Sequence, residues 1–258
     1  FTRAGGPSVT CSTHTNHIRL ERLNPGDEYD IQVRMRCGNR WTNYSPHFVF
    51  NTPICDGSET VTIPNEQDTT FGVLTTNRLP FDGTANNSYT QQLYLAEEIG
   101  QAGYINYIML NFSENSTPSA FFYCYFYLGH TDKTRFLDSN DFVDPRDLQM
   151  VYMGMVSATT GWFRIKLDTP FPYNGTDNMV LAVVNIGGSA TPHAFFTAHA
   201  TSEVTSIQTE LPTSSFRDLN EIDSISTHRS LYRIRNHVSF ELCPDPECAI
   251  DRDRKSVV

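Results

Sequence analysis

Apolar and polar positions alternate over short segments along most of the chain, and Gly, Pro and Asn separate these segments. Such alternation is the pattern of β-strands that place one face in a core. It predicts strands over residues 17–22, 29–37, 47–51, 89–94, 105–112, 121–128, 150–157, 162–167, 179–184, 194–198 and 232–242. Helical patterns are scarce: one short turn is expected at 95–100, before Gly100, and another at 144–148, around Pro145. The sequence therefore predicts an all-β protein.

The strand pattern is interrupted at residues 53–58, where Pro, Cys, Asp and Gly lie close together. Such a stretch is typical of a joint between domains. From Cys243 onward the alternation stops and charged residues follow, which predicts an exposed tail. We therefore expect one domain over residues 1–55, a second over 56–242, and a tail or the start of a linker over 243–258.

Charge, apolar stretches and cysteines limit the partners and the cellular location that we expect for the protein. The net charge of −10 argues against nucleic acid, because affinity for a phosphate backbone depends on clustered Lys and Arg. No stretch approaches the roughly 18 to 20 apolar residues of a membrane span, so we expect none. An even number of cysteines fits disulfides in an exported protein, and we expect a secreted or cell-surface location. The cysteines are Cys11, Cys37, Cys55, Cys124, Cys243 and Cys248.

Residues 23–34 read Leu-Asn-Pro-Gly-Asp-Glu-Tyr-Asp-Ile-Gln-Val-Arg. Pro25 and Gly26 turn the chain, and Tyr29 is placed to hydrogen-bond back across the turn. The segment resembles the E to F corner of a fibronectin type III domain, and the match continues through Trp41 to a last strand that ends near Pro53. The resemblance implies an immunoglobulin-like sandwich of which residues 1–55 supply only the second half.

Two explanations of this half domain stay open. The first residues lack an initiating Met and a secretory signal, so one explanation is that the chain is a trimmed or incompletely represented fragment. The other is that a different segment donates the missing strands. In both cases Ile31, Val33 and Met35, which alternate on one strand face, need a cover. We expect upstream residues or a strand from a neighbouring chain to supply it in the native assembly.

A second set of motifs runs through the longer part of the chain. It includes Ser-Tyr-Thr-Gln-Gln-Leu-Tyr-Leu at 88–95, Tyr-Leu-Gly-His-Thr at 127–131, Leu-Asp-Thr-Pro-Phe-Pro-Tyr-Asn-Gly-Thr-Asp-Asn at 167–178 and Arg-Ser-Leu-Tyr-Arg at 229–233. In order and spacing these motifs resemble a β-sandwich module of large secreted surface proteins of Bacteroidetes-type bacteria, near the cleaved-adhesin jelly rolls. The resemblance implies a jelly-roll-like antiparallel sandwich whose role is adhesion or glycan binding rather than catalysis.

Signatures of catalysis are missing from the sequence. There is no GxSxG, HExxH, GxGxxG or P-loop. His193 and His199 would share one face of a straight strand, but at about 20 Å apart they could not hold one metal ion, so both are interpreted as surface or edge residues. We expect no enzyme activity, with any catalytic domain outside this chain.

Aromatic residues are the best candidates for ligand binding, because aromatic faces on a β-sandwich stack against the C–H groups of sugar rings. On the strand predicted at 121–128, the tyrosines alternate with a more apolar set made of Phe, Cys and Leu. The apolar set is expected in the core, which leaves the tyrosine face toward a solvated groove. The candidate ligand-binding residues are Tyr104, Tyr107, Tyr123, Tyr125 and Tyr127.

One loop carries several oxygen ligands within seven residues, Asp138, Asn140, Asp141 and Asp144. Calcium prefers such oxygen ligands on a flexible loop, so the segment is a candidate calcium site. The alternative is a solvated turn in which Asp144 caps a short helix before Pro145.

Together these observations predict a non-catalytic adhesion or binding segment of a larger exported bacterial surface protein that recognises glycan or host protein. Two alternatives stay open: an accessory region of a secreted peptidase or glycosidase, and a structural stalk or fibre subunit.

Overall fold

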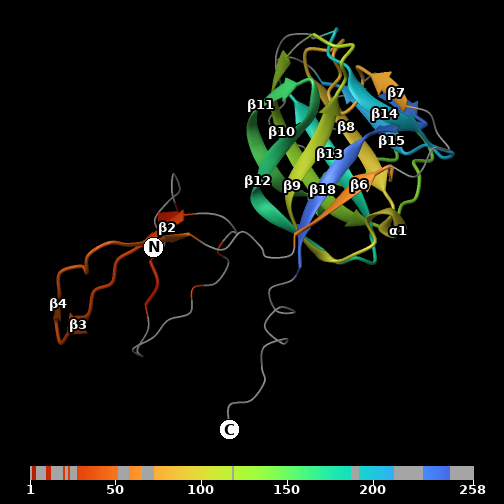
Figure 1. Cartoon of the computed structure of the whole chain (residues 1–258). Helices are drawn as coiled ribbons and strands as arrows, with labels where there is room; N and C mark the ends of the chain where they lie inside the picture. Colours follow the sequence, from red (N-terminus) through yellow and green to blue (C-terminus); the bar gives the residue numbers. More distant parts are fainter. Residues whose placement is uncertain are drawn as a thin grey trace. The chain divides into compact units, whose positions relative to one another are not determined.

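The computed structural model describes residues 2–3, 10–12, 20, 23, 28–51, 58–65, 73–117, 119–186, 192–211 and 229–244. The chain divides between Gly57 and Ser58 into two compact units, and strands make up most of the regular structure in both (Figure 1). Each unit is described separately below.

The first unit holds two small antiparallel sheets. One has the order β1 (Thr2–Arg3), β2 (Glu28–Ile31), β5 (Phe48–Asn51), and the other pairs β3 (Arg36–Cys37) with β4 (Arg40–Trp41). Tyr29 is buried and stacks on Phe50, with ring centroids 5.8 Å apart. Of the strand expected at 17–22, only Leu20 lies within the described residues.

The strand predicted over 29–37 is interrupted. Strand β2 ends at Ile31, and regular pairing resumes only at Arg36 in β3. Between them the side chain of Ser45 accepts a hydrogen bond from the Val33 backbone, 3.0 Å away, which takes the place of a regular strand ladder. Val33 and Met35 are strongly exposed in this chain, as their apolar alternation without a partner sheet predicted.

The second unit is a sandwich of two sheets in which every pairing is antiparallel, which confirms the predicted all-β class. The first sheet has the order β11 (Gln149–Thr159), β10 (Ser119–Thr131), β13 (Asn178–Asn185), β8 (Ser88–Tyr94), β15 (Ser206–Glu210), β16 (Arg229–Tyr232). The second has the order β17 (Ile234–Asn236), β14 (Phe196–Ala200), β9 (Gly103–Phe112), β18 (Val238–Cys243), β6 (Glu59–Ile63), with β12 (Gly161–Tyr173) beside β9 and β7 (Val73–Thr76) beside β14.

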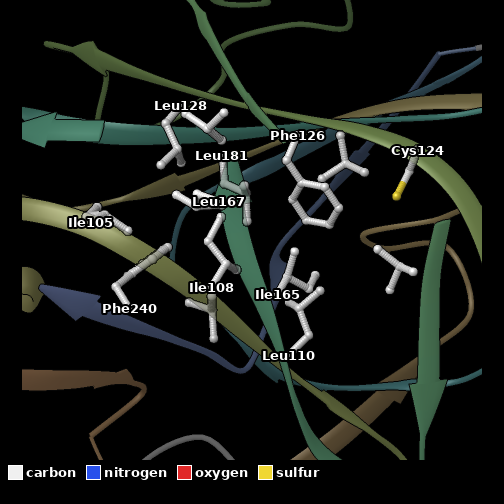
Figure 2. Packing of buried hydrophobic residues seen from close by; sticks show 14 of the residues in the cluster. Ile105, Ile108, Leu110, Cys124, Phe126, Leu128, Ile165, Leu167, Leu181 and Phe240 are labelled. Atoms are coloured by element: carbon white, nitrogen blue, oxygen red, sulfur yellow. The ribbon is translucent and has the colours of Figure 1, made fainter. Parts of the chain in front are cut away.

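The core lies between these two sheets (Figure 2). Phe126 and Leu181 come from the first sheet and face Ile108 and Phe240 from the second. Such interdigitated apolar side chains dominate the stability of a two-sheet fold.

Two predicted strands differ from the observed ones for identifiable reasons. The single strand expected over 232–242 is three strands, because the chain leaves the first sheet after Tyr232 and enters the second at Ile234. Strand β12 runs on to Tyr173, beyond the expected end at 167, because a register shift between Lys166 and Phe171 accommodates the proline-containing stretch. The turn at Asn174 and Gly175 joins β12 and β13, which belong to different sheets.

Both short helical turns are present where the sequence predicted them. Helix α1 (Ala96–Ile99) ends at Gly100, whose φ of 76° is the left-handed conformation that glycine favours. The 3-10 turn η1 (Pro145–Asp147) begins after Asp144, whose side chain accepts a hydrogen bond from the Arg146 backbone. Neither of these described helices has the length or apolar character needed to span a membrane.

The disulfides that the even number of cysteines predicted are not seen at three of the described cysteines. Cys11, Cys37 and Cys124 are free thiols, and Cys55 and Cys248 lie outside the described residues. Cys124 points into the core from β10, and burial raises the pKa of its thiol. A side chain in that position packs as a small apolar group rather than as half of a bridge.

Candidate ligand-binding surface

The outer face of the first sheet carries an exposed aromatic stripe on strand β10. The even-numbered residues 120–128 are buried in the core, and the odd-numbered ones point outward. Phe121 is 62% exposed and Tyr123 is also exposed. The tyrosine face therefore points away from the core, as the alternation predicted.

Methionines of the neighbouring edge strand β11 lie beside this stripe. The register pairs Tyr123 with Met155 and Tyr125 with Met153, and directly opposed residues of an antiparallel pair project to the same side. Met155 is 59% exposed, and Met153 is also exposed. Phe121, Tyr123, Tyr125, Met153 and Met155 thus form one surface, which we call the aromatic–methionine patch.

The patch is closed at one end by the loop over residues 132–148. Tyr125 and Tyr127 are half-buried and pack against a small cluster on the outer face of the sheet that includes the buried Tyr89. Phe142 of the loop stacks on Tyr89, with ring centroids 5.4 Å apart. The exposure therefore rises along β10 from Tyr127 toward Phe121.

The tyrosine hydroxyls of the patch can act as hydrogen-bond donors. The rings of Tyr123 and Tyr125 meet edge to face, with centroids 6.0 Å apart. Burial, together with the neighbouring Tyr123 hydroxyl, raises the pKa of Tyr125 above its usual value. The Tyr125 hydroxyl accordingly stays protonated at neutral pH and can donate to a polar group of a ligand.

Side chains fix the outer edge of β11 and so hold the methionines in place. The Met153 backbone N–H donates to Oδ2 of Asp168 on β12 at 3.0 Å. The Tyr152 hydroxyl donates to the carbonyl of Met155 at 3.0 Å. An edge strand restrained in this way is a firmer platform than a loop.

Tyr104 and Tyr107 do not join this patch. Both lie on β9 in the other sheet, with outward-facing neighbours on β12 and β18. The Arg164 guanidinium covers the ring of Tyr107 at 3.5 Å from its centroid and forms an ion pair with Glu241. The five predicted tyrosines therefore divide between the outer faces of two sheets, and Tyr107 already has a cation on its ring.

The acidic loop places its four predicted calcium ligands near other partners. Asp141 forms an ion pair with Lys133 and accepts a hydrogen bond from the Leu137 backbone at 2.8 Å. Asp138 accepts from the Asn140 backbone at 2.7 Å. These contacts are those of a closed, hydrogen-bonded turn.

The remaining two predicted ligands are engaged by arginines. Asn140 Oδ1 accepts from Arg229 at 2.6 Å, and Asp144 forms an ion pair with Arg146 that lowers the pKa of the Asp144 carboxyl to about 2. Within the described ranges, no three His, Cys, Asp or Glu side chains gather in a way that could hold a metal ion. Calcium binding at this loop stays a prediction, and it would require these cations to be displaced.

The sequence did not predict a buried charged cluster around Arg235. Arg235 on β17 donates from Nη1 to Glu98 Oε2 and to the Leu93 carbonyl, both at 2.8 Å, and from Nε to His199 Nε2 at 3.1 Å. His199 is buried, so its interpretation as a surface or edge residue is wrong, whereas His193 is exposed. The physical reason is that β14 is an inner strand, with β17 and β7 on either side of His199.

The sequence also did not identify Met153 and Met155 as parts of a binding site. The sequence predicts the strand at 150–157, but its alternation alone does not say which strand lies beside it. The register with β10 is what brings Met153 and Met155 next to the tyrosines.

Comparisons with known proteins add no assignment. No family model matches the chain, and a search of curated proteins gives no match.

Proposed function

We propose that this chain is a non-catalytic binding segment of a larger exported surface protein, and that the aromatic–methionine patch contacts its ligand. The observation that carries the proposal is the exposure of Phe121, Tyr123, Met153 and Met155 side by side on a restrained sheet edge. Exposing contiguous apolar surface is unfavourable in water, and such surfaces mark interaction sites. Residues 88–95 and 167–178, which resemble an adhesin-type sandwich, point to the same class of function.

The composition of the patch favours a protein ligand over a sugar. Aromatic residues and Met are enriched at protein interfaces, where the flexible thioether side chain fills irregular apolar surfaces. A sugar site needs fixed polar groups beside the aromatic ring, whereas Tyr123 and Tyr125 lie opposite methionines on β11, and Tyr125 lies opposite Val184 on β13. A host surface protein is therefore the first candidate ligand and a glycan the second.

Binding of the full chain to an array of glycans and purified extracellular-matrix proteins tests this function. Tyr123→Ala and Met155→Ser should each weaken binding to a protein ligand by about tenfold or more, because truncating a central contact of an interface costs on the order of 2 kcal/mol. Trp162→Ala is the matched control, since Trp162 is an exposed aromatic residue on the outer face of the other sheet.

The possible results of these experiments distinguish the proposed function from its alternatives. Binding that survives both patch variants, or that is lost in Trp162→Ala alone, would place the ligand elsewhere. Assembly of the isolated chain into fibres, with no binding to the array, would favour the structural stalk. Turnover of a peptide or glycoside by the chain itself, abolished by one point mutation, would contradict the non-catalytic assignment.

A further inference from the structure

The first unit presents an arginine–aromatic ribbon, which we define as Arg34, Arg36, Trp41 and Tyr44 on and beside the β3–β4 hairpin. The Arg34 guanidinium carbon lies 4.5 Å from the ring centroid of Trp41 and 4.7 Å from that of Tyr44. The corresponding atom of Arg36 lies 5.9 Å from the Trp41 ring. Cation–π contacts of this kind hold the guanidinium groups over the rings.

Backbone hydrogen bonds keep the ribbon in shape. Arg36 pairs directly with Trp41, so their side chains share one face of the hairpin. The Thr42 backbone N–H donates to the Met35 carbonyl at 2.9 Å, and Gly38 makes the turn with a φ of 61°. Arg36 Nε also donates to the Gly38 carbonyl at 3.1 Å. The cationic side chains are thus mounted on a paired structure rather than on a free loop.

Among the described residues, the arginines of the ribbon have no carboxylate partner, unlike five arginines of the second unit. In the second unit Arg78, Arg135, Arg146, Arg164 and Arg235 each form an ion pair with Asp or Glu. Within the described part of the chain, no carboxylate forms an ion pair with Arg34, Arg36 or Arg40. Among the described residues, Arg34, Arg36 and Arg40 therefore place three positive charges without a carboxylate partner on and beside one hairpin of a chain whose net charge is −10.

We propose that the arginine–aromatic ribbon is a binding site for an anionic polysaccharide, a glycan chain that carries carboxylate or sulfate groups. A guanidinium held over an aromatic ring still directs its N–H edge outward, where it can bind a carboxylate or sulfate in bidentate fashion. Trp41 stays 53% exposed although Arg34 lies over its ring, and this exposed part of the ring can contact the C–H groups of a sugar. A chain with a charge on successive sugars matches cations spaced along a ribbon.

The small extent of the basic surface favours an anionic glycan over nucleic acid as the ligand. A duplex or single strand of nucleic acid needs an extended basic surface, whereas this basic surface is one hairpin on an acidic chain. The site lies in the first unit and does not depend on the aromatic–methionine patch, so either proposal can fail alone.

Heparin and polygalacturonate serve as probes of sulfated and carboxylated chains, with dextran as the neutral control and single-stranded DNA as the other polyanion. The full chain carries two tryptophans, so a Trp162→Phe background leaves Trp41 as the only one and makes its fluorescence a direct report of binding. We expect at least one anionic glycan to change Trp41 emission, with an affinity that falls as salt is added. Dextran should leave the emission unchanged.

Variants test the roles of charge and ring separately, by calorimetry. Arg34→Gln with Arg36→Gln should weaken binding at least tenfold and reduce its salt dependence, because two ionic contacts are lost. Trp41→Ala should weaken binding while the salt dependence stays close to that of the parent. Arg233→Gln removes one positive charge, half the change of the double variant, from an exposed arginine of the second unit and should leave the affinity within about twofold.

Circular dichroism and thermal unfolding of each variant establish that the fold is retained. Equal affinity of the Arg34/Arg36 double variant and the parent would overturn the proposal. So would equal losses in that variant and in Arg233→Gln, which would reduce the effect to net charge. Tighter binding of single-stranded DNA than of either glycan, or no response to either glycan, would also overturn it.

Discussion

Replacing Glu98 by Gln tests whether the buried Arg235 cluster stabilises the second unit. The side chain of Arg235 is 6% exposed and that of Glu98 is 27% exposed, so the arginine is the deeper partner. Besides Arg235, Glu98 accepts a hydrogen bond from the Leu95 backbone at 2.8 Å, where it caps helix α1. The substitution keeps the shape of the side chain and removes its charge, which leaves a buried guanidinium without a counterion.

The expected cost follows from that geometry. Breaking a fully buried ion pair by removing one partner costs about 3 to 5 kcal/mol, and water access to Glu98 reduces this to about 2 to 3 kcal/mol. Loss of a negative charge from the first turn of α1 adds about 0.3 to 1 kcal/mol, because that charge interacts favourably with the helix N-terminus. For a unit of this size, a total of about 3 kcal/mol corresponds to a decrease in Tm of roughly 6 to 12 °C.

Urea and thermal unfolding of the full chain, followed by circular dichroism, measure this loss. Glu241→Gln is the matched control, because it removes the partner of Arg164, whose side chain is 48% exposed. Its cost should stay below about 1 kcal/mol. A double-mutant cycle with Arg235→Met should give a coupling energy above about 1.5 kcal/mol between positions 98 and 235. Equal losses in Glu98→Gln and Glu241→Gln, with coupling near zero, would refute the argument.

Three further predictions concern pH, calcium and thiol reactivity. Burial lowers the pKa of His237 and of His130 below 6.5, so the unfolded chain binds more protons than the folded chain. The free energy of unfolding should therefore fall as pH drops below about 6.5. In urea titrations, His237→Asn should reduce that fall. Calcium at a hundredfold excess over Kd would add about 2.7 kcal/mol, so identical melting curves in calcium and in chelator would contradict a site at Asp141. Cys124 should resist alkylation in the native state and react only on unfolding, while a native reaction as fast as that of the exposed Cys37 would disprove its burial.

Much of the second unit could be read from the sequence because its strands show simple patterns. Strand β10 alternates between core and outside, and β13 is apolar throughout because both faces are covered. Strand β15 was not predicted, since polar residues dominate it although four of its five residues are buried, and β6 was not predicted because polar residues, mostly outside the core, alternate with Val61 and Ile63. Buried polar residues become recognisable only when their hydrogen-bond partners are known.

At the candidate surface, too, the sequence predicted what depends on one strand and not what depends on which strands are neighbours. Alternation within β10 was enough to orient Tyr123 outward, because it compares neighbours in one strand. It could not assign Tyr107 to the opposite sheet or bring Met155 beside Tyr123, because both depend on strand order and register. His199 was misread for a related reason, since its burial depends on Arg235 from a distant segment.

The polar network inside the sandwich gives the proposed binding surface a rigid support. Gln92 on β8 and Asn236 on β17 exchange two hydrogen bonds of 2.9 and 2.8 Å and so link the two sheets. Gln208 on β15 donates to the fully buried Asp82 at 2.8 Å, which anchors the loop before β8.

Fully satisfied polar contacts of this kind specify one arrangement of the strands, because each slipped register would leave buried groups unpaired. Strand β13 joins β8 directly to β10, so the register fixed at β8 also fixes the strand that carries Tyr123. A ligand at the aromatic–methionine patch would then meet a preformed surface and lose little affinity to ordering it.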